Sequence, residues 1–183
     1  IDVGVAAAKI AEYGDEYVML DESIASEEYG ICFRKAVAEM PIAVSELANP
    51  EEEQLARLEN DYLRQIGEPI LTEEKRRALT EAIRAGRITF FMAWRGAHAV
   101  GMCSVARCFS TFACSDVGVF EDFYVEPAFR GRGVARMLAQ AAQEWCRANG
   151  VASLTVCSAP CDAEMYQVLG FGAPLGTTFA YLG

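Results

Sequence analysis

A turn that could bind phosphate groups follows a run of β-forming residues in the second half of the chain. The run ends at Val125, and Pro127 prevents the strand from continuing. Gly131 and Gly133 then allow the backbone to turn tightly into a helix that begins at Val134. The first amides of a helix have no partners within it and lie at the positive end of its dipole, which suits anions. The residues predicted to form this phosphate site are Arg130, Gly131, Arg132, Gly133, Val134 and Ala135.

Three kinds of phosphate-binding turn can be distinguished here. A dinucleotide fingerprint needs a third glycine where Arg136 stands, and an acid near the end of the next strand, where Cys157 and Ser158 stand. A Walker loop needs Gly-Lys-Ser/Thr, and the sequence contains none. What remains is the Arg-x-x-Gly-x-Ala sequence at residues 130–135, which matches the pattern Arg/Gln-x-x-Gly-x-Gly/Ala.

This loop resembles the pyrophosphate loop of the GNAT N-acetyltransferase superfamily. The resemblance includes a first strand at residues 32–36, the Tyr-Val-x-Pro approach at 124–127 and the Tyr-x-x-x-Gly-Phe sequence at 166–171, and it covers roughly residues 30–183. The loop alone is a weak signal. The loop and the Tyr-x-x-x-Gly-Phe sequence at this separation, in this order of elements, are together a strong one.

By this resemblance the ligand is acetyl-CoA or another acyl-CoA, bound as the acyl-donor cosubstrate. Its pyrophosphate would lie on the amides of the loop. Its pantetheine arm would lie along the backbone of Tyr124 and Val125, where the family's two parallel strands diverge and leave a strand edge that amides can pair with. Many members place Asn seven residues before the tyrosine and Ala four before it, whereas this chain has Ala159 and Asp162. Ser158 would then replace the Asn contact, and Asp162 would cap the helix.

The resemblance implies direct attack of an amine on the thioester carbonyl, so a group must first remove a proton from the amine, whose pKa is about 10.4 in solution. Glu121 and Asp122 are the candidates. Strict strand alternation places Glu121 on the side of Phe123 and Asp122 on the opposite side, although a bulge would exchange the faces. Desolvation on an apolar face raises the pKa of a carboxylate toward useful basicity. We favour Glu121, acting directly or through a water; the alternative is a solvated acid at the sheet edge.

The departing thiolate needs a proton, and the resemblance assigns Tyr166 as the acid that supplies it. A phenol suits this role because its pKa is near 10, so it remains protonated at neutral pH. The alternative is a tyrosine that only packs on an amphipathic helix. The backbone N–H of Val125 would stabilise the oxyanion.

The helices and strands that must position these residues are predicted from the spacing of apolar residues, and their ends from Gly, Pro and Thr residues. A hairpin and a third strand precede the loop, and a strand, helix, strand unit with parallel strands follows it. The predicted class is therefore α+β, a GNAT-like mixed and mostly antiparallel sheet flanked by helices. The predicted strands are 30–36, 88–94, 99–109, 117–125, 154–157 and 177–182; two or three helices are predicted within 38–85, one beginning at Thr72, and further helices at 134–148 and 162–169.

Length and charge indicate one domain with a small appendage. The 183 residues are 52% apolar, enough for one core. Residues 1–29 are predicted to be an acidic N-terminal appendage, partly helical over 5–13, and residues 30–183 the acyltransferase domain.

The net charge of −10 would repel nucleic acid and anionic lipid, so we expect neither as a partner. It favours a small cationic amine as acceptor, such as an aminoglycoside or polyamine, while a protein N-terminus or lysine stays open. No apolar stretch is long enough for a membrane span. A homodimer is also left open, as is a binding module that senses acyl-CoA without turnover.

The cysteines and the single histidine give no sign of a metal site. His98 is the only histidine and no Cys-x-x-Cys pair occurs, so we expect no metal, and a Ser-His-Asp or Cys-His device would also have to use His98. Trp94, Phe109, Phe112 and Tyr181 are interpreted as core or hairpin aromatics. The cysteines, interpreted as reduced core thiols in a cytoplasmic protein, are Cys32, Cys103, Cys108, Cys114, Cys146, Cys157 and Cys161.

Overall fold

The computed structural model describes residues 17–19, 32–34, 41–50 and 52–176. The chain divides into two compact units, 1–41 and 42–183. In the first unit, β1 (Tyr17–Met19) pairs antiparallel with β2 (Cys32–Arg34). The helix predicted at 5–13, the strand predicted at 177–182 and Tyr181 lie outside the described residues. The separate appendage at 1–29 stays a prediction.

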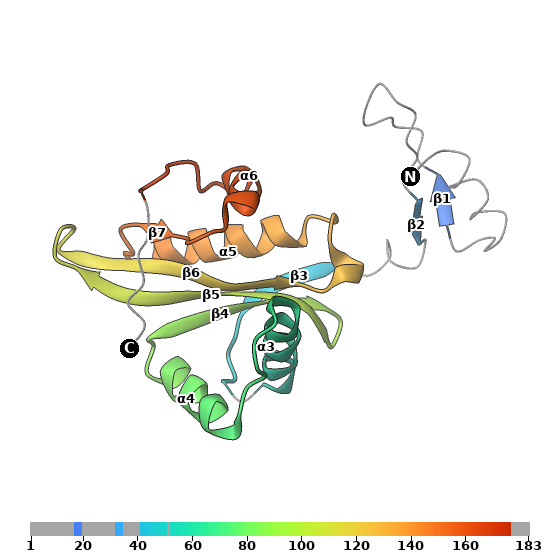
Figure 1. Ribbon diagram of the computed structural model, residues 1–183, viewed down its shortest axis with the longest axis horizontal. Helices are drawn as coiled ribbons and strands as arrows, with labels where there is room; N and C mark the ends of the chain where they lie inside the picture. Colours follow the sequence, from blue (N-terminus) through green and yellow to red (C-terminus); the bar gives the residue numbers. More distant parts are fainter. Residues whose placement is uncertain (1–16, 20–31, 35–40, 51, 177–183) are drawn as a thin grey trace. The chain divides into compact units, whose positions relative to one another are not determined.

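A five-stranded sheet forms the centre of the second unit (Figure 1). Neighbouring strands are antiparallel from β3 to β6, and β6 and β7 are parallel. The predicted α+β class with one parallel pair is therefore confirmed. The strands, in both chain and spatial order, are β3 (Ile42–Glu46), β4 (Ile88–Arg95), β5 (His98–Ser110), β6 (Ser115–Val125) and β7 (Leu154–Thr155).

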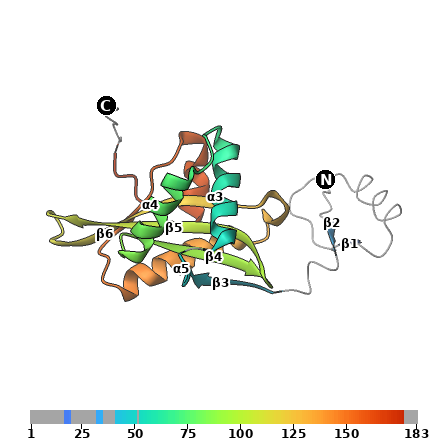
Figure 2. The same ribbon diagram turned by 90° about the horizontal axis from the view of Figure 1, so that it is seen from below.

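Helices cover both faces of this sheet, α3 and α4 on one face and α5 and α6 on the other (Figures 1 and 2). The predicted start at Thr72 is confirmed, because its hydroxyl accepts a hydrogen bond from the Lys75 N–H at 3.2 Å. Among the described residues every helix is too short or too polar to cross a bilayer. The helices are α3 (Glu53–Ile66), α4 (Glu73–Arg84), the 3-10 turn η2 (Pro127–Phe129), α5 (Val134–Ala148), the 3-10 turn η3 (Pro160–Asp162) and α6 (Ala163–Val168).

Two hydrophobic layers hold the helices on the sheet. The layer under α5 includes Phe91, Phe120 and Leu138, and the layer under α3 includes Leu58 and Met102. Each fully buried side chain of this size stabilises the fold by roughly 1.5 to 3 kcal/mol relative to exposure. The layer into which a side chain of β6 packs therefore shows on which face of the sheet that side chain lies.

The edge strand β3 corrects the prediction of helices throughout 38–85 and of a first sheet strand at 32–36. Residues 32–34 do form a strand, but it pairs with β1 in a separate two-stranded sheet. The first strand of the main sheet is β3, which lies between 41 and 50. Ile42 and Val44 pack against the core under α5, so apolar side chains alternate with others as in a strand. The segment is too short for this alternation to be recognised in the sequence.

Four of the six cysteines whose side chains the structure describes do not lie in the core. Cys103 and Cys146 are buried, as predicted. The others are exposed because they lie on the far part of the β5–β6 hairpin or on the segment after β7; they are Cys108, Cys114, Cys157 and Cys161. Phe109 and Phe112 are also exposed at this hairpin, whereas Trp94 packs against the core layer under α3.

Candidate active site

The parallel strands β6 and β7 pair at only two positions and then diverge. Gly118 pairs with Leu154 and Val119 with Thr155, and β7 ends there, two residues before the predicted end at Cys157. Within the described segments, β6 has no strand partner on this side from Phe120 onward. A cleft of about 980 Å³ opens at this point, bordered by β6, α3, α6 and the start of α5.

The backbone of Val125 faces this cleft. The Glu126 N–H donates to the Val100 carbonyl at 2.9 Å. In an antiparallel ladder this makes Gly101 and Val125 a non-hydrogen-bonded pair, so the N–H and C=O of Val125 point away from β5. The Arg130 Nε donates to the Val125 carbonyl at 2.8 Å. The Val125 N–H is thus directed toward the side that β7 has left.

The turn before α5 presents the first amides of the helix to the same cleft. Gly131 and Gly133 have φ angles of 71° and 81°, in the left-handed region that favours glycine. No side chain caps the start of α5. Its first amides therefore keep the capacity to bind an anion at the positive end of the helix dipole. Gly131 and Gly133 both line the cleft, and the backbone of Val134 begins the helix.

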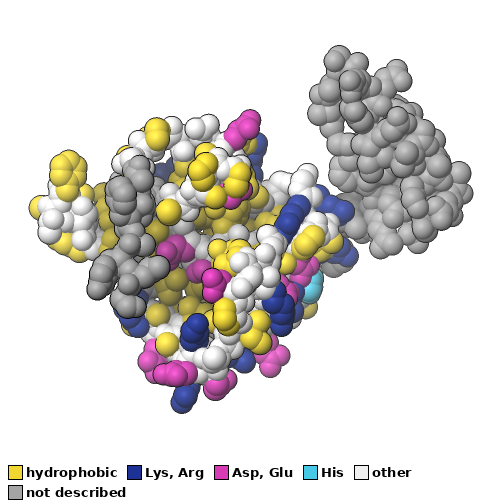
Figure 3. Space-filling model, viewed as in Figure 1, with side chains coloured by type: hydrophobic (Ala, Val, Ile, Leu, Met, Phe, Trp, Pro, Cys, Tyr) yellow, Lys and Arg dark blue, Asp and Glu magenta, His cyan; other side chains and the backbone are white. Residues whose placement is uncertain are grey.

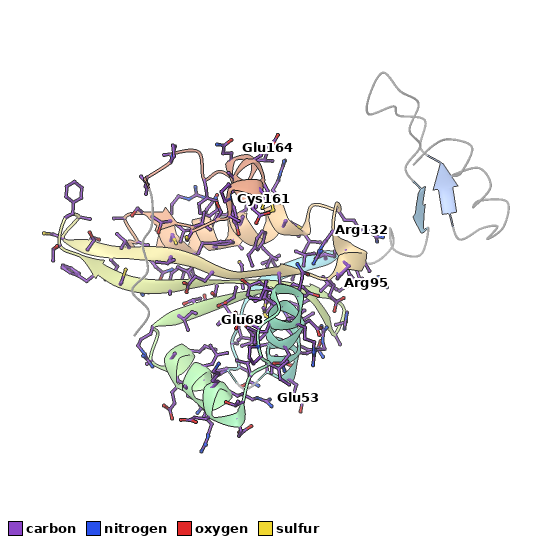
Figure 4. All side chains as sticks on the ribbon, viewed as in Figure 1. Glu53, Glu68, Arg95, Arg132, Cys161 and Glu164 are labelled. Carbon is purple, nitrogen blue, oxygen red and sulfur yellow. The ribbon has the colours of Figure 1, made fainter. Side chains whose placement is uncertain are left out.

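Three arginines surround this turn, and each does something different. The Arg130 guanidinium donates to the Gln65 Oε1 in α3 as well as to Val125, so its side chain connects the loop to α3. Arg132 lies at the turn before α5 with its guanidinium 5.8 Å from the Phe129 ring centroid (Figure 4). Arg136 lines the cleft from the first turn of α5, although the sequence analysis used it only to exclude a dinucleotide fingerprint. Its position in the sequence, on the first helical turn after Gly131 and Gly133, already indicated that it would lie near the phosphate site.

A β-bulge places both candidate bases on one face of β6. Ser104 of β5 pairs with Glu121 and Met102 pairs with Tyr124, so two residues of β6 lie opposite one residue of β5. Asp122 is the bulged residue, with a φ of 48°. The prediction from strict alternation, which put Glu121 and Asp122 on opposite faces, is wrong for this reason. The exchange of faces by a bulge, which the sequence left open, occurs.

The bulge directs these two carboxylates toward α3. The Ser104 hydroxyl donates to the Asp122 Oδ2 at 2.8 Å. Burial raises the pKa of Tyr62 in α3, and the charges of Asp122 and Glu121 raise it further. Phe123 packs into the core under α5 instead. Both carboxylates line the cleft, and so does the ring of Tyr124. The side of the cleft toward α3 is therefore acidic.

Burial changes the acidity of both carboxyl groups in the direction that a base requires. Desolvation raises the pKa of Asp122, opposed by the hydrogen bond from Ser104. Desolvation also raises the pKa of Glu121, and the charge of Asp122 raises it further. A carboxylate with a raised pKa holds a proton more strongly and so accepts one from an amine more readily.

Glu59 is a third carboxyl group near the bulge, which the sequence analysis missed. It lies in α3 with 5% of its surface exposed, and its Oε1 has no hydrogen-bond partner in the described part of the chain. Burial, followed by the charge of Asp122, raises its pKa to about 8. A signal was present, because Glu59 takes an apolar position in the i, i+3, i+4, i+7 series of Leu55, Leu58, Glu59 and Tyr62.

Glu59→Gln is expected to reduce the pH dependence of stability. The carboxyl group titrates near 4.5 when unfolded and near 8 when folded, so the folded state binds more protons between these values. Stability is then lost as pH rises through this window, by up to about 1.4 kcal/mol per pH unit. Thermal melts should show the variant more stable than the wild type at pH 8, with the difference shrinking toward pH 5. A constant difference across this range would contradict the assignment.

Tyr166 lies on the opposite wall of the cleft, in α6. Its ring packs against Phe123 and Phe171, with centroids 6.1 and 5.9 Å away. Burial raises its pKa, and the nearby Tyr62 and Asp162 raise it further, so the phenol remains protonated at neutral pH. It lines the same cleft as Glu121 and Asp122. A protonated phenol can donate a proton to a group bound in that cleft.

The segment between β7 and α6 differs in part from the sequence-based expectation. Asp162 stands at the N-cap of α6 but its side chain makes no capping hydrogen bond there, so the predicted cap is wrong. Ser158 is exposed and does not line the cleft, whereas Cys157 does. A contact from Ser158 to a ligand stays a prediction.

His98 belongs to a network of polar side chains directly after the C-terminal end of β6. Its Nε2 lies 3.1 Å from the Glu126 carboxylate, which also accepts from the Arg57 guanidinium at 2.6 Å. This network connects α3 to the end of β6. Over the described ranges, no three His, Cys, Asp or Glu side chains come together in a group that could hold a metal ion.

Apolar side chains surround the acidic part of the cleft. Figure 3 shows acidic side chains in the middle of this face with apolar ones around them. Ile66 of α3 and Met165 and Val168 of α6 line the cleft, although 41 to 63% of their surface is exposed. The site therefore has an uncapped helix start at one end and carboxylates at the other, between half-apolar walls.

Comparisons with known proteins identify a family and several solved structures to which this chain is similar. A family model described as "Acetyltransferase (GNAT) family" matches residues 53–171. No curated protein sequence matches the chain. An aminoglycoside acetyltransferase from an uncultured soil metagenomic sample, solved with sisomicin, is 15% identical with a TM-score of 0.67, and the match covers 78% of this chain and 95% of that one.

Two further solved structures share the fold. A predicted acetyltransferase from Clostridium acetobutylicum, solved with acetyl-CoA, is 14% identical with a TM-score of 0.66, over 77% of this chain and 96% of that one. AAC(6')-Iy, solved with the bisubstrate analogue CoA-S-monomethyl-acetylneamine, is 22% identical with a TM-score of 0.65, over 78% of this chain and 98% of that one. At these identities the solved structures show a shared fold.

Proposed function

The chain belongs to the acetyltransferase (GNAT) family, and from this premise we propose that it transfers an acyl group, first of all acetyl, from coenzyme A to a primary amine. The observation that carries the proposal is the cleft at the diverging strands. It combines an uncapped helix start, a free strand edge, two carboxylates and a phenol within one space of about 980 Å³.

The chain's own groups fit an acyl-CoA at both ends of this cleft. The amides from Arg130 to Ala135 would bind the pyrophosphate, since the two glycines hold the turn open and no side chain occupies the helix start. Arg132 and Arg136 add positive charge, while the Arg130 side chain is engaged with Val125 and Gln65. The pantetheine arm would lie along β6 beside Tyr124 and Val125, on the side that β7 has left.

The residues on either side of the thioester would supply acid, base and oxyanion groups. Asp122 or Glu121 accepts the proton of the amine, whose nitrogen then bonds to the carbonyl carbon. The Val125 N–H donates to the carbonyl oxygen as it gains negative charge. The carbon–sulfur bond breaks, and Tyr166 donates a proton to the sulfur. Since the bulge brings both carboxylates to one face, either one can serve as the base.

The acidic end of the cleft supports a small cationic amine as the acceptor. Two carboxylates line it, and the chain as a whole carries a net charge of −10. Relatives solved with sisomicin or with an acetylneamine analogue carry ligands of this kind. The apolar rim formed by Ile66, Met165 and Val168 would exclude water from the reacting groups.

An amine panel with acetyl-CoA tests this function. The full chain is expected to gain thermal stability from acetyl-CoA and to release free thiol with at least one small cationic amine, such as a polyamine or aminoglycoside. Thiol release only with a lysine peptide or a peptide N-terminus would move the acceptor class to proteins. Stabilisation by acetyl-CoA with no thiol release from any amine would favour a sensor without turnover.

A further inference from the structure

Two energetically costly features of the fold meet at the acidic end of the cleft. Asp122 adopts a left-handed conformation that disfavours residues with a Cβ. Glu59 buries a carboxyl oxygen without a hydrogen-bond partner in the described residues. Costs of this kind, concentrated at one place, are typical of functional sites.

The described groups that act on Glu59 and its neighbours are acids and hydroxyls, with no basic side chain among them. The charge of Asp122 in β6 acts on Glu59 and on Glu121, Glu59 acts on the Tyr62 hydroxyl in its own helix, and the Ser104 hydroxyl of β5 donates to Asp122. Burial raises the pKa of Glu59 and of Glu121, and the charge of Asp122 raises both further; burial also raises the pKa of Asp122, opposed by the Ser104 hydrogen bond. None of the three carboxyl groups forms an ion pair within the described segments. The cluster therefore has an excess of negative charge that only a proton or an incoming cation can balance.

Building on the proposed function, we infer that Glu59 determines acceptor specificity by exchanging its proton for the positive charge of an amine bound beside Asp122, and that the site prefers acceptors with a second ammonium group. In the free protein Glu59 holds a proton at neutral pH. An ammonium ion in the cleft stabilises the ionised carboxylate, and the proton leaves to solvent. No covalent bond to carbon changes in this exchange.

The preference for a second charge follows from the number of carboxylates. A monoamine brings one positive charge, which Asp122 balances, and so leaves Glu59 without a partner. A diamine brings a second ammonium group, and this group balances the ionised Glu59. Glu59 does not line the cleft and acts through the electric field, so it is a positioning and selecting residue and not a catalytic one.

Calorimetry with matched amines tests this inference. The full chain, saturated with CoA so that no transfer occurs, is titrated at pH 7 with 1,4-diaminobutane and with 1-aminobutane in two buffers of different ionisation enthalpy. The wild type is expected to release about one proton per diamine bound and to bind the diamine about tenfold more tightly than the monoamine. Glu59→Gln should release no proton and lose most of this preference.

A second variant separates this effect from a general change of charge or stability. Glu53 lies in the same helix with its side chain exposed, so Glu53→Gln removes one carboxylate without changing the cleft. It should keep both proton release and diamine preference. Infrared difference spectra give an independent readout, since the band of a protonated carboxyl group should disappear on adding diamine to the wild type and to Glu53→Gln only.

The outcomes also separate this inference from the proposed function. Equal proton release and equal diamine preference in the wild type and Glu59→Gln would overturn the inference even if thiol release from acetyl-CoA is observed. So would the absence of amine binding to the CoA-saturated wild type. Proton release that depends on Glu59, without thiol release from any amine, would support the inference and contradict catalysis.

Discussion

Gly133→Asp is expected to abolish acetyl-CoA binding. Gly133 is the N-cap residue of α5, and the first amides of this helix are the proposed pyrophosphate site. A carboxylate there would cap these amides and place a negative charge against the diphosphate. We expect the dissociation constant, measured by calorimetry, to rise by at least about 100-fold.

Two variants distinguish the charge from the change of backbone. Gly133→Asn has the same shape as the aspartate variant without its charge, and Asn tolerates a positive φ better than most residues, so it should weaken binding only modestly. Gly86→Asp introduces an aspartate at another positive-φ glycine, after α4 and outside the cleft, with open space around its Cβ position. It should bind acetyl-CoA like the wild type. Normal binding by Gly133→Asp would mean that the loop is not the phosphate site.

Tyr166→Phe is expected to lower turnover about 100-fold while leaving acetyl-CoA affinity unchanged. The variant keeps the ring that packs against Phe123 and Phe171 and removes only the hydroxyl group. Loss of a general acid commonly costs 10² to 10⁴ in rate, and 100-fold is about 2.7 kcal/mol of activation free energy. The measurement is kcat with a saturating amine, together with the dissociation constant for acetyl-CoA.

The split between kcat and affinity identifies the role of Tyr166. A tyrosine that served only in packing would leave kcat intact, because the phenylalanine variant keeps the packed ring. Because the pKa of Tyr166 is raised above its ordinary value of 10, the loss should also be constant across neutral pH. Unchanged turnover would falsify the acid role and leave the phenol as a wall of the cleft.

The loop, the hairpin and α5 could be predicted because their signals are local. Pro127, Gly131 and Gly133 each restrict or release their own backbone, whatever lies elsewhere in the fold. The strand β3 could not be predicted in the same way, because it is an edge strand of five residues whose partner begins at Ile88. Its pairing with β4 overrides a weak local pattern.

The faces of the two candidate bases could not be predicted, because the register with β5 decides them. The sequence around Asp122 contains no glycine that would mark a bulge; the extra residue shows only when Glu121 and Tyr124 are paired with Ser104 and Met102. The orphaned oxygen of Glu59 depends likewise on how α3 packs. Its position in an apolar helical series was visible in the sequence, but its neighbours were not.

The guanidinium of Arg130 has a consequence for how the cleft responds to its contents. It spans from the Val125 carbonyl to the Gln65 amide, and so connects the turn before α5 with the end of α3. The two ends of the cleft are therefore mechanically linked through one side chain. A displacement of the turn would pull on the helix that carries Glu59 and Tyr62, so we expect the two ends of the cleft to adjust their shapes together.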